Sequence, residues 1–307
     1  MSDQKGTGAP TLVRGCLSDL SEGAMQWLGR NLQFFDPLSP WSPLPVRRSI
    51  RAAIELALLC RVWAKLKPAT DVLYEATVLL EKIWARPEFP LLIDMHGGTY
   101  ADIHKLAYVA LAPAGAREDV REAALARLKA DGYLLPLAKS PYRQLEIRYF
   151  ADMANAEHGL EPYRDLAGKS LLARLPASPV GPNDAYLLTH TVFYLSDFGC
   201  CDLDLPADVR DRAERFTRSM LDFCVRQNLW DLTAELIVAT VVLGGGSVDT
   251  PSGQAGIRCL AQAQLDNGAI PGASAADRAR PSQAAAEFFR KAYHTTLVTA
   301  LMALIVG

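Results

Sequence analysis

Three side chains that can move protons lie on one face of a predicted helix near the middle of the chain. In the segment DAYLLTHTVFYLSD, His190, Tyr194 and Asp197 are spaced at i, i+4 and i+7. An imidazole changes charge near neutral pH, and a nearby carboxylate can orient it. The spacing therefore indicates a general acid or base. The alternative is a core histidine with satisfied hydrogen bonds, with Asp197 only ending the helix.

A carboxylate pair follows on the next apolar segment, LWDLTAELIVATVVL, where Asp231 and Glu235 are spaced at i, i+4. Close like charges raise the pKa of one carboxyl group, which would supply a proton donor. Asp231 has a second interpretation, as a first-turn acid that complements the helix dipole. That interpretation accounts for Asp231 alone and gives no reason for Glu235. The carboxylate pair accounts for both, so we expect both residues to be catalytic.

Two further segments carry isolated polar residues. His294 follows Tyr293 in the apolar segment AYHTTLVTALMALIV, and Glu146 and Asp152 flank Arg148 in RQLEIRYFADMA. Burying such groups without partners costs about 1–3 kcal/mol each, so a packed core has no use for them. We expect His294 to be catalytic and Glu146 and Asp152 to bind substrate. An internal ion pair is the competing interpretation for the second set.

Aromatic residues on the same segments are expected to bind the substrate and to stabilise a developing cation. They are Tyr149, Phe150, Phe193, Tyr194, Trp230 and Tyr293.

Other motifs give weaker signals. In IDMHGGTYADIHKLAY, His96 is a secondary candidate for substrate binding, together with Asp94 and His104. The two histidines are too loosely spaced to predict a metal site. Asp202 and Asp204 form a DxD that could hold a magnesium-bound diphosphate, but such a motif beside a proline is commonly a solvated turn.

The elements that must position these residues are helices. Almost every long segment has three-to-four spacing of apolar residues, and no alternating run resembles a strand pair. Charged amphipathic segments, such as 117–130 and 207–226, alternate with segments that are apolar nearly all round, such as 184–197, 229–243 and 292–306. A helix that is apolar on every side must be buried on every side. The pattern predicts an all-α protein with outer and inner helices.

Pairing each outer helix with the next inner one predicts six hairpins. Their approximate ranges are 18–65, 70–113, 117–158, 162–197, 207–244 and 253–306. We expect them to close into an (α/α)6 toroid forming a single domain over 18–307, after a flexible N-terminus over 1–17. An open solenoid is the alternative, although neither terminal hairpin has an obviously polar capping face. In a toroid the amino-terminal ends of the inner helices would meet at one mouth and favour anionic or polar substrates there.

Composition excludes several classes of protein. Half of the 307 residues are hydrophobic and the formal charge is −2, so the chain is globular and nucleic acid is not an expected partner. The N-terminus lacks the pattern of a secretion signal, and no apolar stretch is long enough for a membrane span. The six cysteines have neither zinc-type spacing nor the context of disulfide staples. We therefore expect reduced, mostly buried thiols in a cytoplasmic protein.

The last repeat resembles a known family. AQAQLDNGAIPG followed by FFRKAYHTTLVTALMAL is similar to the repeat of terpene cyclases and protein prenyltransferase β-subunits, through Gln264, Gly268, Tyr293, His294 and Thr295. The resemblance implies an α/α toroid. In the prenyltransferases the histidine binds zinc together with an Asp-x-Cys. Here Asp231 matches the aspartate, but Thr233 replaces the cysteine, so no metal ligand is assigned. The phrase LLTHTVFYLSDFG also looks like a motif of an uncharacterised actinobacterial family, which implies no function.

The first hypothesis for function is an enzyme of specialised, natural-product metabolism. It would be a cyclase, lyase or isomerase that needs no cofactor and uses acid–base residues in a central, largely apolar cavity. The substrate would be a small molecule or a peptide, and the sequence leaves a homodimer open.

Two alternatives keep the same toroid. One is a metal-dependent hydrolase or transferase, with Asp231, His294 and His190 as ligands. The other is a binding or partner subunit without catalysis. Its docking arm would be the Pro-rich segment 35–45 (FDPLSPWSPLP), unless that segment is an ordered strap packed across the barrel.

Overall fold

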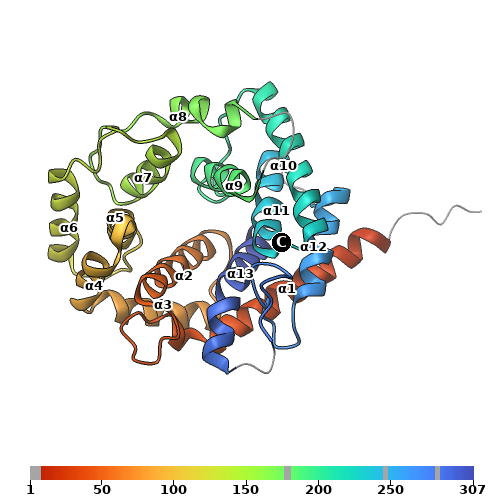
Figure 1. Ribbon diagram of the computed structural model, residues 1–307, viewed down its shortest axis with the longest axis horizontal. Helices are drawn as coiled ribbons and strands as arrows, with labels where there is room; N and C mark the ends of the chain where they lie inside the picture. The colour runs from red at the N-terminus through yellow and green to blue at the C-terminus, as the bar shows by residue number, and fades with distance from the viewer. Residues whose placement is uncertain (1–7, 176–180, 245–247, 281–283) are drawn as a thin grey trace, which may run out of the picture.

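The computed structural model describes residues 8–175, 181–244, 248–280 and 284–307, and these form helices and no β-strand (Figure 1). The prediction of an all-α chain is confirmed for these residues. Six helices surround the centre: α2 (Val46–Leu66), α5 (Ala101–Ala110), α7 (Pro141–Met153), α9 (Pro182–Ser196), α11 (Trp230–Gly244) and α13 (Ala285–Val306). The others lie outside them: α1 (Gly8–Arg30), α3 (Asp71–Trp84), α4 (Glu88–His96), α6 (Glu118–Ala130), α8 (Tyr163–Lys169), α10 (Ala207–Gln227) and α12 (Pro251–Ala263). Three short 3-10 helices complete the set: η1 (Leu32–Phe35), η2 (Gly98–Tyr100) and η3 (Leu171–Ala173).

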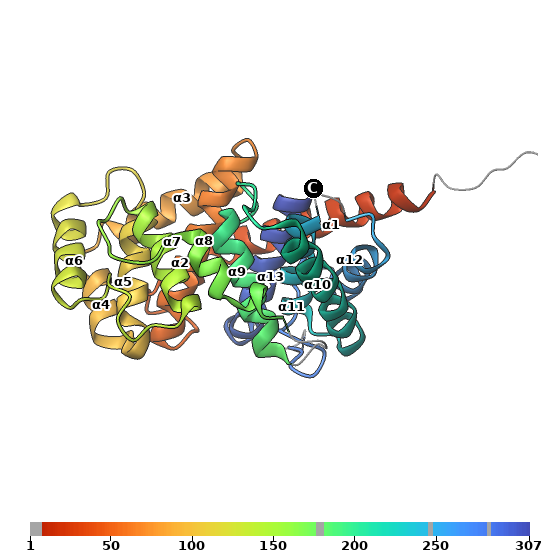
Figure 2. The same cartoon turned by 90° about the horizontal axis from the view of Figure 1, so that it is seen from above.

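The inner helices contact one another in a ring. Each packs against the next in the order α2, α5, α7, α9, α11 and α13, and α13 packs against α2. Figure 1 shows the molecule viewed along the axis of this ring, with the outer helices arranged around it. Figure 2 shows α1 running beside α12 and α13, so the first helix of the chain covers the last.

The inner helices run in the same direction. Near the start of α9 and of α11, Tyr186 donates a hydrogen bond to Asp231. At their other ends, Lys65 near the end of α2 binds Asp197, the residue that follows α9. The amino-terminal ends therefore meet on one side of the ring and the carboxyl-terminal ends on the other.

The sequence explains the division into outer and inner helices. On α10 the buried residues Ala213, Phe216, Met220 and Cys224 recur at three- and four-residue spacing, and the charged residues face solvent. On α11 nearly every residue is buried. An element without a polar face has to lie between other elements, which puts α11 in the ring with α10 and α12 outside it.

Capping residues and prolines in the sequence set where helices begin, and several helices begin close to the predicted boundaries. α7 begins with Pro141 in its first turn, after Ser140, whose Oγ accepts a hydrogen bond from the backbone N–H of Arg143 at 3.2 Å. The predicted hairpin 70–113 contains an additional outer helix, since both α3 and α4 precede α5. α1 begins at Gly8, earlier than the predicted start at 18, and residues 1–7 of the predicted flexible N-terminus lie outside the described residues.

The turn between α12 and α13 joins the two ends of the ring. Gln264 Nε2 donates to the carbonyl oxygens of Leu20 on α1, at 3.1 Å, and of Gly268, at 3.0 Å. Gly268 has a φ of +91°, and a Cβ there would lie 2.0 Å from the carbonyl oxygen of Gly23. These two residues of the predicted repeat motif therefore have a packing role between the last and first hairpins.

The Pro-rich segment 35–45 is ordered and packed. Phe35 and Leu44 are buried, and Arg86 donates to Asp36 Oδ1 at 2.5 Å. Pro40, Trp41 and Pro45 are exposed, and Trp41 projects with 78% of its surface exposed. The segment thus matches the strap interpretation, except for Trp41.

All six cysteines are unpaired. Cys224 and Cys259 are buried, Cys16, Cys60 and Cys200 are half-buried, and Cys201 is exposed, so the prediction of mostly buried thiols holds for two of the six.

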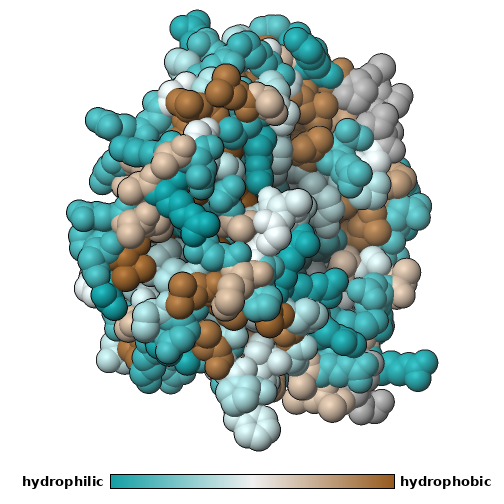
Figure 3. Space-filling model, turned by 60° about the vertical axis from the view of Figure 1, so that its left-hand side comes forward, coloured by the Kyte–Doolittle hydropathy of each residue, from teal (hydrophilic) through white to brown (hydrophobic). Residues whose placement is uncertain are grey.

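The side that carries α4 and α6 is mainly hydrophilic, with hydrophobic residues in separate small groups (Figure 3). Within the described ranges, the helices are all too short or too polar to cross a bilayer.

Candidate functional site

A cavity of about 300 Å³ lies at the centre of the ring. All six inner helices and η2 contribute to its wall, which is mainly apolar. The apolar lining residues are Ile54, Leu58, Leu59, Ile103, Ala107, Phe150, Phe193, Phe198, Val238, Leu297, Val298 and Leu301. The polar ones are Arg51, Glu55, Tyr100, His104, Tyr142, Glu146, His190, Tyr194, Glu235 and His294.

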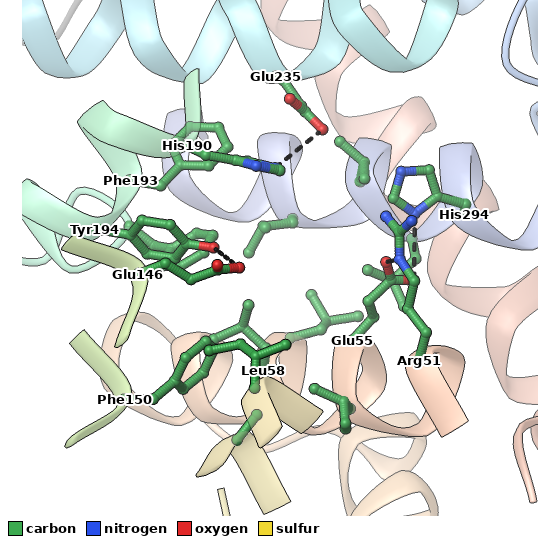
Figure 4. Close-up of a pocket in the computed structure, with 18 of the residues that line it drawn as sticks. Arg51, Glu55, Leu58, Glu146, Phe150, His190, Phe193, Tyr194, Glu235 and His294 are labelled. Carbon is green, nitrogen blue, oxygen red and sulfur yellow. Dashed lines mark hydrogen bonds and ion pairs between the residues drawn. The ribbon is translucent and has the colours of Figure 1, made fainter. Parts of the chain in front are cut away.

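Seven of the principal predicted site residues meet in this cavity. They are Glu146, Phe150, His190, Phe193, Tyr194, Glu235 and His294. They come from four different inner helices, α7, α9, α11 and α13, and Figure 4 shows them around one space.

His190 is held between a tyrosine and a carboxylate. Tyr142 Oη lies 3.1 Å from His190 Nδ1, and Glu235 Oε1 lies 3.8 Å from His190 Nε2. Glu235 is buried, and its other oxygen accepts a hydrogen bond from Thr189 Oγ1 at 2.6 Å. When Nδ1 donates to Tyr142, Nε2 is free to take a proton, and Glu235 stabilises the imidazolium that results.

His294 belongs to a second pair on another side of the cavity (Figure 4). Its Nδ1 lies 3.2 Å from Glu55 Oε2, and Arg51 Nε donates to Glu55 Oε1 at 2.6 Å. Burial alone would lower the pKa of His294, but the charge and hydrogen bond of Glu55 outweigh it, so this pKa is raised. Burial opposes ionisation of Glu55, but Arg51 and His294 outweigh it and lower the pKa of Glu55 to about 2. The arrangement favours a protonated His294 beside an ionised Glu55.

Tyr194 and Glu146 form a third polar group. Tyr194 Oη donates to Glu146 Oε1 at 3.3 Å, and Arg143 forms an ion pair with the other oxygen of Glu146. Burial raises the pKa of Tyr194 well above its ordinary value, and the carboxylate of Glu146 adds to the effect. Tyr194 is therefore a neutral hydrogen-bonding group in the wall.

His104 differs from the other two histidines because its Nδ1 has no hydrogen-bond partner among the described residues. Only 9% of the residue's surface is exposed, and this nitrogen is buried. Its ring stacks on Tyr100, with centroids 6.1 Å apart. Burial, then the positive charges of Arg51 and Arg47, lower the pKa of His104 to about 4. His104 is thus a neutral imidazole that faces the cavity.

Asp197 lies away from the cavity, although it shares a helix face with His190. It is the C-cap of α9, with φ of +48°, and Arg61 Nη1 donates to its Oδ1 at 2.8 Å. Tyr149 Oη donates to the same oxygen at 2.8 Å, and Lys65 completes the cluster. Two predicted site residues, Asp197 and Tyr149, are therefore partners in an ion-pair network at the carboxyl-terminal ends of the inner helices.

Three other predicted residues lie behind the cavity wall. Asp231 accepts hydrogen bonds from Tyr186 and from the backbone N–H of Leu232, the latter at 2.8 Å. Trp230 is buried at the start of α11, and Tyr293 stacks on Phe289. None of the three is among the lining residues. Asp231 matches its alternative interpretation as a first-turn acid.

The remaining two predictions fall outside the ring interior. His96 is exposed at the end of the outer helix α4. Asp152, near the end of α7, binds His158 Nε2 at 2.8 Å and Arg148 at 3.3 Å, which matches the competing interpretation as an internal ion pair. The aspartates of the DxD motif, Asp202 and Asp204, are exposed.

Sequence reasoning missed Arg51, Glu55 and Tyr142 as site residues. Glu55 stands alone in the apolar run AAIELALLC, which is the signal that identified Glu235. The arginines earlier in α2 make the whole segment less uniformly apolar than the inner segments from which the candidate residues were taken.

The described residues do not form a recognisable metal centre. Within them there is no group of three or more His, Cys, Asp or Glu side chains arranged to hold a metal ion. Of the three proposed ligands, His190 faces Glu235, His294 faces Glu55, and Asp231 is bound to Tyr186.

Comparisons with known proteins identify a family and no activity. The model of a domain of unknown function, DUF6895, matches residues 21–304, which include the whole lining of the cavity. No curated protein and no solved structure matches the chain. The resemblance of the last repeat to terpene cyclases and prenyltransferase β-subunits has no support from these comparisons.

Proposed function

Because the chain belongs to the DUF6895 family, we propose its function from the geometry of the cavity. We propose an (α/α)6 toroid whose central cavity is the active site of an enzyme of specialised metabolism. The reaction is a proton-transfer reaction of the cyclase, lyase or isomerase type, and it needs no cofactor. The closed ring of contacts among the six inner helices supports this fold.

The observation that carries the proposal is the placement of two histidine–glutamate pairs around one mainly apolar space (Figure 4). A reaction that removes a proton at one atom and adds it at another needs a base and an acid within reach of one substrate. Apolar surroundings strengthen the charge interactions of both groups and exclude competing water.

The two histidines have different roles. His294 is the acid, because Glu55 favours its protonated form. His190 is the base through Nε2, with Tyr142 orienting the ring and Glu235 stabilising the cation that forms. Phe150, Phe193 and other apolar lining residues hold the body of the substrate.

The test uses solvent deuterium as a reporter of proton transfer. The purified protein is incubated in D2O with fractionated small-molecule extracts, and mass spectrometry records compounds that change or gain deuterium. We expect such compounds with the native chain and a loss of rate of about 10²–10⁴-fold in His190→Gln and in His294→Gln.

His158→Gln is the matched control, because His158 also pairs with a carboxylate but lies outside the cavity. If His158→Gln lowers the rate as much as the cavity variants do, or if a small molecule is bound but never altered, the cavity is not catalytic. The second outcome would favour a binding subunit.

A further inference from the structure

The polar and apolar residues of the cavity are separated along the ring axis. The charged and ring-nitrogen groups lie mainly in the first halves of their helices, as with Arg51, His104 and Glu235. The apolar residues, such as Leu58, Phe150 and Leu301, lie mainly in the second halves. Because the inner helices run in parallel, the cavity has a polar end and an apolar end. A ligand that fills it is amphipathic.

The polar end has one corner that is rich in positive charge. Arg51 uses Nε for Glu55, while 53% of its side chain remains exposed. Arg47 lies one turn earlier on α2, with its guanidinium 4.4 Å from the centroid of the Tyr100 ring. Within the described residues, Arg47 forms no ion pair with a carboxylate. The amino-terminal end of α2 adds a partial positive charge at the same place.

His104 lies in this corner, stacked on Tyr100. A buried ring nitrogen without a partner costs free energy, and such a group in a native wall calls for a partner from a ligand. The lowered pKa of His104 agrees with the nearness of the arginines, since Arg51, Arg47 and Arg143 all disfavour its charged form. His104 therefore offers a neutral N–H or lone pair where the arginines supply charge.

The carboxylates of the cavity are already engaged. Glu55 binds Arg51 and His294, and Glu146 binds Arg143 and Tyr194. Glu235 accepts from Thr189 and faces His190, which stands on α9 and not in the arginine corner.

We infer that the cavity binds a ligand with an apolar body and an anionic head, a carboxylate or a phosphate, and that Arg51, Arg47 and His104 hold the head. The apolar body extends along Leu58, Phe150 and Leu301. This inference rests on the proposed function in that it names the substrate class of the same cavity. The anionic head also orients the body between His190 and His294.

The test compares probes with one tail and different heads. Octanoate, octyl phosphate, octanol and octylammonium are titrated into the full chain by calorimetry. We expect at least one anionic probe to bind about tenfold or more tightly than octanol. We also expect this preference to shrink as sodium chloride is raised from about 20 mM to about 500 mM, because salt screens exposed charges.

Variants assign the preference to the arginine corner. Arg51→Gln, Arg47→Gln and His104→Leu are expected to reduce the anion preference, with octanol binding unchanged in Arg47→Gln. Arg212→Gln is the control, because Arg212 also pairs with a carboxylate four residues away and has a similar exposure of 48%, but lies on the outer helix α10. Arg47 is exposed on the surface, so its variant remains informative if Arg51→Gln does not fold.

Equal binding of octanol and the anions, tighter binding of octylammonium, or an undiminished preference in Arg47→Gln and Arg51→Gln would overturn the inference. Octanol binding without an anion preference would leave the cavity as a binding site and the proposed function standing. Binding by none of the four probes would count against both.

Discussion

The two ends of the inner ring both hold polar clusters, but the clusters differ in how well their groups are paired. At the carboxyl-terminal end, Asp197 is bound directly by Arg61, Lys65 and Tyr149. At the amino-terminal end, His104 Nδ1 has no hydrogen-bond partner among the described residues, and His190 is hydrogen-bonded to Tyr142 but stands 3.8 Å from Glu235. The groups of the first cluster are paired with one another and need no ligand, whereas the second cluster borders a cavity.

Spacing on a helix does not identify a site by itself. His190 and Asp197 share a face of α9, but a rise of about 1.5 Å per residue separates them by roughly 10 Å along the axis. His190 therefore reaches the polar part of the cavity, whereas Asp197 lies at the opposite end of the ring. Completeness of pairing separates a structural cluster from a functional one.

The largest expected effect on stability comes from breaking the paired cluster. Asp197→Asn keeps a residue type that tolerates the left-handed backbone at this position but removes the charge that holds Arg61 and Lys65. We expect the free energy of unfolding to fall by about 1–3 kcal/mol, measured by urea denaturation. The exposed pair of Asp208 and Arg212 supplies the control, since Asp208→Asn should leave the free energy of unfolding nearly unchanged.

The matching change in the other cluster is Glu235→Gln. The amide keeps a hydrogen-bond acceptor for Thr189 but removes a buried charge, so the loss of stability should stay below about 1 kcal/mol, while proton transfer through His190 is lost. A larger stability loss in Glu235→Gln than in Asp197→Asn would reverse the assignment of the two ends.

The next effect is on the pH dependence of stability. The raised pKa of His294 means that its pair with Glu55 stabilises the fold at low pH and loses this contribution as the pH rises through the raised value. The pKa of Glu55 falls from 4.5 to about 2, so its contribution is present above pH 4.5 and is lost as the pH falls toward 2. The pair therefore contributes most between these two limits.

Glu55→Gln should remove both effects of pH on stability, the loss at high pH that comes from His294 and the loss at low pH that comes from Glu55. We expect the pKa of His294 to fall, because burial and Arg51 then act against only Glu235, the remaining carboxylate that favours the charged ring. NMR titration of the histidine resonances measures this, with the exposed Glu157→Gln as control. An unchanged His294 pKa would mean that Glu55 does not hold the proton there.

The sequence predicted the helices that form the cavity wall better than the pairing of the polar side chains that face the cavity. The segments that are apolar nearly all round became α9, α11 and α13, because a helix without a wet face has to be buried. The inner helix α2 is less uniformly apolar, because it carries charged residues near both ends and Glu55 between them. Arg47 and Arg51 reach the polar end of the ring, and Arg61 and Lys65 bind Asp197 at the other.

The pairs that polar residues form with one another could not be predicted from the sequence, because the partners come from different hairpins. Asp231 is bound to Tyr186, and Glu55 is bound to His294, which lies far from it in sequence. Spacing along one helix carries no information on such pairs, which depend on how neighbouring helices are rotated and shifted.

The smallest expected effect comes from removing a single hydrogen bond beside His190. Tyr142→Phe removes the hydroxyl 3.1 Å from His190 Nδ1 and leaves the aromatic ring in the wall. A neutral hydrogen bond contributes about 0.5–1.5 kcal/mol, so kcat should fall between about twofold and about tenfold, and the free energy of unfolding should fall by no more than this amount. The matched change is Tyr149→Phe in the paired cluster, which should lower stability and leave kcat near that of the native chain. Should Tyr142→Phe affect only unfolding and Tyr149→Phe only kcat, the hydroxyl of Tyr142 would be structural, and the catalytic end of the ring would be the one that holds Asp197.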